Sequence, residues 1–142
     1  MLTAVGKTSY KAFISYSHRD RIWGAWLQRA LETYRVPRHL VGTQGEFGPI
    51  EKRLAPVFRD REDLSSGADL SSKVQDTLRS TDTLVVICSP ASAQSLWVDR
   101  EIRYFQQRGK ANRIFALIVD GDPQSEDPGQ ACFPPALTKG PD

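Results

Sequence analysis

The chain has 142 residues, the size of one domain, and its 39% apolar and 25% charged residues are typical of a globular protein and not of a disordered one. The formal net charge of +2 is too small to indicate nucleic-acid binding by itself. No apolar run approaches the roughly 20 residues that span a bilayer, and the amino-terminal residues lack a secretory apolar core. We therefore expect a cytoplasmic setting.

Four short apolar runs predict strands, and they cover Tyr10–Tyr16, Ala55–Phe58, Thr83–Cys88 and Ile114–Val119. The last two are continuously apolar and rich in β-branched residues, which is typical of strands buried on both faces of a parallel sheet. Cys88 lies inside such a run, so we expect it to be a small buried side chain. The two cysteines form no CxxC pattern, which argues against a zinc site or a disulfide scaffold.

Three helical patterns, over residues 20–34, 69–79 and 95–108, alternate with the predicted strands. Strict alternation predicts right-handed βαβ units and an α/β fold with helices on both faces of a doubly wound parallel sheet. We expect the flavodoxin-like strand order 2-1-3-4.

The first helical pattern predicts an apolar stripe on one face of the helix. The residues of this stripe are Ile22, Trp23, Trp26, Leu27, Ala30, Leu31 and Tyr34. Ser17 or Asp20 can cap the start of this helix.

Two stretches read as irregular. Residues 37–56 are rich in proline and glycine and are long for a loop, so a short extra element or a function is expected there. Residues 122–142 show neither a fifth strand nor a closing helix. We expect a single domain over residues 1–142, with a core at about 9–121. We also expect that the carboxyl-terminal part of this domain is incomplete here and continues in a longer protein.

Ligands of open α/β sheets bind beyond the carboxyl ends of the strands, where the strand order reverses. In the predicted order this point lies between the first strand, which ends near Ser15, and the third, which ends near Cys88. Trp97 and Glu101 lie four residues apart on the following helix, so they share one helix face near the same edge.

Glu101 borders the apolar stripe of its helix, so its carboxylate can face a cleft while the Trp97 indole offers a surface for stacking. One charged group and one stacking group make a minimal nucleotide site. The same pattern also fits a structural interpretation, with Trp97 in the core and Glu101 solvated and paired with Arg100 or Arg108. The residue pattern leaves both interpretations open.

The chain lacks the sequence motifs of several enzyme classes. The chain has no GxGxxG, GxxxxGK[ST] or GxSxG sequence, which argues against dinucleotide-dependent hydride transfer, P-loop NTPases and α/β-hydrolases. A phosphoryl-accepting receiver domain needs acidic residues after its first and third strands, where this chain has serine, tyrosine and proline.

Four segments together, in order and spacing over roughly residues 9 to 121, resemble the TIR (Toll/interleukin-1 receptor-like) domains of the bacterial NAD+-cleaving type. They are KAFISYSHRD (residues 11–20), FRDREDLSSG (58–67), TLVVICSPAS (83–92) and SLWVDRE (95–101).

This resemblance implies cleavage of the bond between nicotinamide and ribose in NAD+, giving nicotinamide and ADP-ribose or a cyclic ADP-ribose. It implies Glu101 as the catalytic carboxylate, and the substrate-binding residues Trp97, Tyr16, Ser17, Asp60 and Leu64. NAD+ is then the substrate, and neither a metal nor a bound cofactor is needed.

The resemblance also implies self-association through the loop of residues 59–67, although its charge run equally fits a solvated surface. The expected setting is an effector module, driven by a sensor domain or partner in the full-length protein, in bacterial anti-phage defence. It implies no direct binding of nucleic acid or membrane. The alternatives are a non-enzymatic TIR–TIR adaptor and, less favoured, an enzyme acting on another N-glycoside.

Overall fold

A four-stranded parallel sheet forms the centre of the protein in the computed structural model, which describes residues 10–59 and 70–139. The strands are β1 (Ala12–Ser15), β4 (Val57–Arg59), β5 (Thr83–Cys88) and β6 (Ile114–Ile118). Their spatial order is β4-β1-β5-β6, and each neighbouring pair is parallel. The doubly wound α/β fold and the strand order 2-1-3-4 predicted from the sequence are therefore confirmed.

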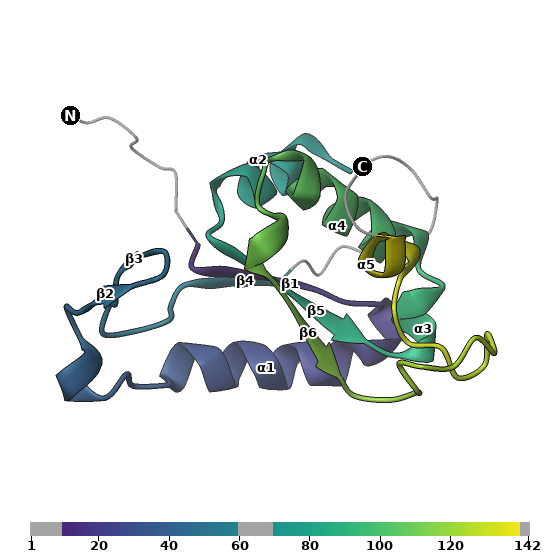
Figure 1. Ribbon diagram of the computed structural model, residues 1–142, viewed down its shortest axis with the longest axis horizontal. Helices are drawn as coiled ribbons and strands as arrows, with labels where there is room; N and C mark the ends of the chain where they lie inside the picture. The colour runs from purple at the N-terminus through teal and green to yellow at the C-terminus, as the bar shows by residue number, and fades with distance from the viewer. Residues whose placement is uncertain (1–9, 60–69, 140–142) are drawn as a thin grey trace.

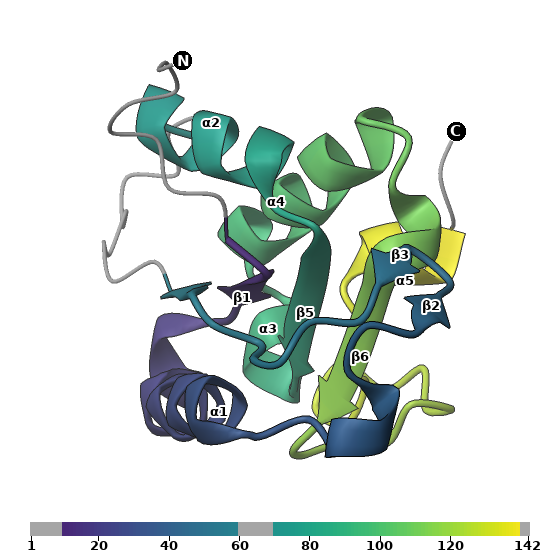
Figure 2. The same cartoon turned by 90° about the vertical axis from the view of Figure 1, so that its left-hand side faces the viewer.

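Helices cover both faces of this sheet (Figures 1 and 2). The longer helices are α1 (Arg21–Thr33), α2 (Ser72–Ser80) and α4 (Leu96–Gln107). The shorter ones are α3 (Pro90–Ala93), α5 (Pro135–Lys139) and the single 3₁₀ turns η1 (His18–Asp20), η2 (Arg38–Leu40) and η3 (Ala111–Arg113). Among the helices of the described ranges, none has the length and apolar character that crossing a bilayer demands.

The core is divided by the sheet into two clusters because side chains alternate between the faces of each strand. The cluster beneath α2 and α4 contains Phe13, Leu70, Val74, Leu78, Leu84, Val86, Cys88, Val98, Ile102, Phe105, Cys132 and Ala136. The cluster beneath α1 contains Ala12, Ile14, Leu27, Val57 and Ile87. Cys88 is fully buried, as predicted.

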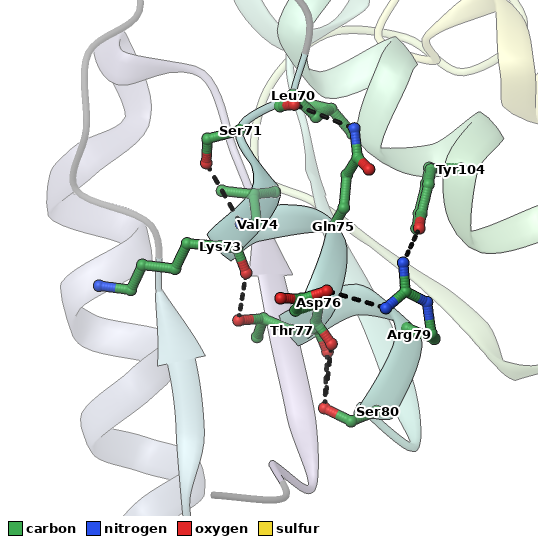
Figure 3. A network of polar contacts seen from close by, with 10 residues as sticks. All are labelled: Leu70, Ser71, Lys73, Val74, Gln75, Asp76, Thr77, Arg79, Ser80 and Tyr104. Carbon is green, nitrogen blue, oxygen red and sulfur yellow. Dashed lines mark hydrogen bonds and ion pairs between the residues drawn. The ribbon is translucent and has the colours of Figure 1, made fainter. Parts of the chain in front are cut away.

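Polar contacts fix α2 and connect it to α4 (Figure 3). The Ser71 hydroxyl accepts the amide proton of Val74 and caps the start of α2. Arg79 donates from one guanidinium nitrogen to Asp76 and from another to the hydroxyl of Tyr104 on α4. These contacts lie at the surface, and the burial of both helices on the same core cluster supplies most of their attachment.

The apolar stripe predicted for the first helix is largely exposed, which corrects the sequence interpretation. Ile22 is 77% and Trp26 is 51% exposed, whereas Gly24 and Leu27 face the sheet. A Cβ at Gly24 would lie 3.2 Å from Cδ of Arg59, so α1 approaches the sheet through a residue without a side chain. Apolar periodicity does not register a glycine as a contact position.

The start of α1 also differs in detail from the two expected caps. The Ser17 hydroxyl accepts the amide proton of Arg19 and so caps η1, not α1. Asp20 is the residue before α1 but makes no side-chain capping bond to it. Its carboxylate has a different partner, Ser89.

Both stretches that read as irregular contain ordered elements. Residues 37–56 include η2 and a small antiparallel pair, β2 (Gln44–Gly45) and β3 (Gly48–Pro49), which confirms the expected extra element. The stretch expected to be an irregular tail contributes α5, and its Ala136 is fully buried in the core. The amide of Ala136 donates to Asp99 of α4, so this segment is fastened to the helix beside it.

Candidate functional site

The candidate site lies at the carboxyl edge of the sheet, between the ends of β1 and β5. β1 leads through α1 to β4 on one side, and β5 leads through α4 to β6 on the other, so the strand order reverses between them. Such a point is where open α/β sheets bind ligands. β1 ends at Ser15, and the segment after β5 brings α3 and then α4 back over the same edge (Figure 1).

Glu101 is buried at this edge, because α4 turns it toward the sheet together with Val98, Ile102 and Phe105. The carboxylate is 1% exposed and accepts a hydrogen bond of 2.6 Å at Oε1 from the hydroxyl of Ser15. The interpretation of Glu101 as a solvated helix residue is therefore wrong. Its burial is also deeper than the border position that the sequence indicated.

Trp97 lies one helical turn before Glu101, in the first turn of α4. Its side chain is half-buried and packs against the core cluster beneath α2 and α4, as does Tyr104. The structure therefore brings the indole and the carboxylate to one region of α4, and leaves part of the indole open to contact.

The other predicted binding residues are placed differently. Tyr16 is half-buried against the cluster beneath α1, so its side chain lies on the opposite face of the sheet from Glu101. The Ser17 hydroxyl caps η1. Asp60 and Leu64 lie outside the residues that the structure describes. The substrate-binding roles of these four residues remain predictions.

Sequence reasoning missed Ser15 and the bond between Asp20 and Ser89. The Ser89 hydroxyl donates to Asp20 at 2.5 Å, and it also accepts the amide proton of Ser92 in a capping box at the start of α3. This bond ties the segment after β1 to the segment after β5. A serine at the end of β1 and a serine directly after β5 were the available sequence signal.

Burial determines the chemistry of the thiol at the same edge. Cys88 ends β5, and burial, followed by the proximity of Cys132 and Asp20, raises its pKa to about 12. A thiol with this pKa is protonated at neutral pH, so Cys88 is no candidate nucleophile.

His18 is exposed in η1. Within the described ranges, no group of three His, Cys, Asp or Glu residues is arranged to hold a metal ion.

Comparisons with known proteins connect this geometry to a family. A family model described as TIR domain matches residues 12–138. The chain is also 30% identical over 114 residues to the curated NAD(+) hydrolase ApTIR of Actinoplanes sp., an alignment that covers 80% of this chain and 14% of that protein. The chain thus spans only a small part of this relative's length.

Among solved structures, the chain is similar to the TIR domains of the activated Roq1 resistosome directly recognizing the pathogen effector XopQ. The TM-score is 0.53 at 20% sequence identity, and the match covers 81% of this chain and 60% of that chain. At this identity the similarity concerns the fold alone. Because the family model matches nearly the whole described chain, the protein belongs to the TIR domain family, which confirms the resemblance seen in its sequence.

Proposed function

We propose that this TIR domain hydrolyses NAD+ at the bond between nicotinamide and ribose, with Glu101 as its catalytic carboxylate. The observation that carries the proposal is the Glu101 carboxylate, held by Ser15 at the carboxyl edge where the strand order reverses. The similarity to a protein named as an NAD(+) hydrolase supports the same reaction.

The reaction makes modest chemical demands on the protein. The bond between ribose C1′ and the pyridinium nitrogen breaks, and its electron pair neutralises the departing nicotinamide. The ribose is left with oxocarbenium character, which a nearby carboxylate stabilises as in glycosidases. Water then adds to C1′ and releases a proton, giving ADP-ribose, or a group of the ADP-ribose adds instead and gives a cyclic product.

We assign the binding of NAD+ to residues around this carboxylate. The half-buried Trp97 stacks on a ring of the substrate. Tyr16 and Ser17 approach from the segment after β1, and Asp60 and Leu64 belong to the residues that follow β4 in the sequence. Binding through Tyr16 and Ser17 requires the segment between β1 and α1 to adjust when substrate binds, because the Tyr16 side chain packs against the cluster beneath α1.

Burial of Glu101 also bears on activation. A carboxylate that is 1% exposed reaches a ribose only after a neighbouring group moves. We propose that self-association through residues 59–67 drives this movement, so that the domain is an effector activated by oligomerisation. In the full-length protein a sensor domain or partner would bring the copies together, in a setting of bacterial anti-phage defence.

The direct test is nicotinamide release from NAD+ by the chain, concentrated by tethering on beads. Glu101→Ala is expected to abolish release while circular dichroism shows the fold retained. Asp76→Ala is a matched control, because Asp76 is an exposed carboxylate on α2 that pairs with Arg79. It is expected to release nicotinamide at the parent rate.

Three results would count against the proposal. Release by Glu101→Ala at the parent rate would show that another group performs the chemistry. Absence of release by the parent, even in forced oligomers, would favour the non-enzymatic adaptor. Inhibition of release by other nucleosides, with faster cleavage of those compounds, would indicate a different N-glycoside as substrate.

A further inference from the structure

Ser15 occupies a rigid position at the end of β1. β1 is paired with β4 on one side and with β5 on the other, and Ser15 stands opposite Val86 of β5. Side chains two residues apart on a strand point to the same face. Phe13 belongs to the cluster beneath α2 and α4, so the Ser15 side chain points toward α4 as well.

The contact between Ser15 and Glu101 is short and buried. The hydroxyl donates to Oε1 at 2.6 Å, a length typical of a hydroxyl bonded to a carboxylate. Both residues are 1% exposed. One side-chain torsion sets the position of a serine Oγ, and the sheet fixes the backbone of Ser15. A glutamate carboxylate, in contrast, lies at the end of a longer and more flexible side chain. The strand therefore supplies a fixed donor for Oε1 of Glu101.

We propose that Ser15 is a positioning residue for the glycosidic cleavage, acting through its hydrogen bond to Oε1 of Glu101. This inference rests on the proposed function of Glu101. The hydroxyl touches no substrate. It holds the carboxylate at the carboxyl edge, so that the charge is in place when the ribose becomes cationic, and no reorientation is needed during the reaction.

The role of the hydroxyl is isolated by two variants of equal shape, Ser15→Thr and Ser15→Val, which differ only in a hydroxyl against a methyl group. Ser15→Thr is expected to keep kcat for nicotinamide release within about 3-fold of the parent, and Ser15→Val to lower it about 10- to 100-fold, the range expected for a hydrogen bond to a charged group. KM for NAD+ should change less than about 2-fold in both, because ground-state binding is untouched.

A purely structural role gives a different pattern. It predicts losses that follow the folded fraction and that vanish when kcat is expressed per folded molecule. Equal kcat values for Ser15→Thr and Ser15→Val, so expressed, would overturn the positioning role. If the larger side chains prevent folding, Ser15→Ala, which only removes atoms, is expected to show the same fall in kcat at constant KM, and a parental kcat would overturn the role.

A thermal-unfolding cycle separates this inference from the proposed function. The melting temperatures of the parent chain, Ser15→Ala, Glu101→Ala and the double variant test the contact without any turnover, because each single variant removes one partner of the hydrogen bond. Non-additive shifts are expected because the two groups interact, and additive shifts would overturn the contact on which the inference depends. A parent that releases no nicotinamide defeats the proposed function, whatever this cycle shows.

Discussion

Helices α1 and α4 each place a glutamate against the same sheet, but at opposite ends of its strands. Glu32 on α1 accepts the amide proton of Val57 at 2.9 Å, at the amino end of β4. Glu101 on α4 accepts a side-chain hydroxyl at the carboxyl end of β1. The Glu32 carboxylate accepts from a backbone amide at the start of a strand, which is a structural role. The second lies where the fold binds ligands.

The tryptophans of the two helices differ in the same way. Trp97 of α4 packs against the core, whereas Trp23 and Trp26 of α1 are both exposed and contact each other edge to face, with ring centroids 5.8 Å apart. Residue type alone therefore does not distinguish a site from a surface. The end of the strand and the partner that each side chain finds do distinguish them.

The largest expected effect is on stability, and it contrasts the two helix faces. Phe105→Ala removes a fully buried ring from α4 and should lower the free energy of unfolding by about 3–5 kcal/mol. Trp26→Ala removes a side chain that is 51% exposed and should cost less than about 1 kcal/mol. Urea unfolding measures both values. A loss from Trp26→Ala as large as that from Phe105→Ala would break the contrast.

A smaller effect is expected on substrate binding. Trp97→Ala should raise KM for NAD+ about 10-fold, the scale of one lost stacking contact, when rates are expressed per folded molecule. Trp26→Ala, on the other helix, should leave KM unchanged. Steady-state nicotinamide release over a range of NAD+ concentrations gives both constants, and equal KM values for the two variants would remove Trp97 from the proposed site.

The smallest effect concerns the structural glutamate. Glu32→Gln keeps an oxygen that can accept from the Val57 amide but removes its charge, so the free energy of unfolding should fall by about 1 kcal/mol. Chemical denaturation measures this change. A gain in stability instead would mean that burying the charge of Glu32 costs more than its hydrogen bond contributes.

The sequence predicted the order of strands and helices because alternating apolar runs and helical periodicities are local properties of the chain. It did not predict which side of α1 packs, since Gly24 makes that contact without an apolar side chain. It also placed Glu101 and Trp97 on one helix but missed Ser15 as a partner. That hydrogen bond joins residues 86 positions apart, and only the assembled sheet brings them together.

The second missed contact has the same origin. Asp20 read as a helix cap from its local surroundings, but its carboxylate accepts from Ser89, 69 positions away. Local capping preferences therefore compete with partners that the fold supplies. The helix α5 was missed because its five residues are too few to show a periodicity, and its attachment to Asp99 comes from another part of the chain.

The central claim is that the charge of Glu101, and not its mere presence on the helix, drives cleavage. The most direct measurement compares nicotinamide release by Glu101→Gln and Glu32→Gln, each tethered on beads and expressed per folded molecule. Both substitutions keep the shape of the side chain and remove one charge. We predict a loss of at least about 100-fold for Glu101→Gln, the scale of one lost electrostatic contact to the transition state, and the parent rate for Glu32→Gln. Equal rates for the two variants would contradict the claim.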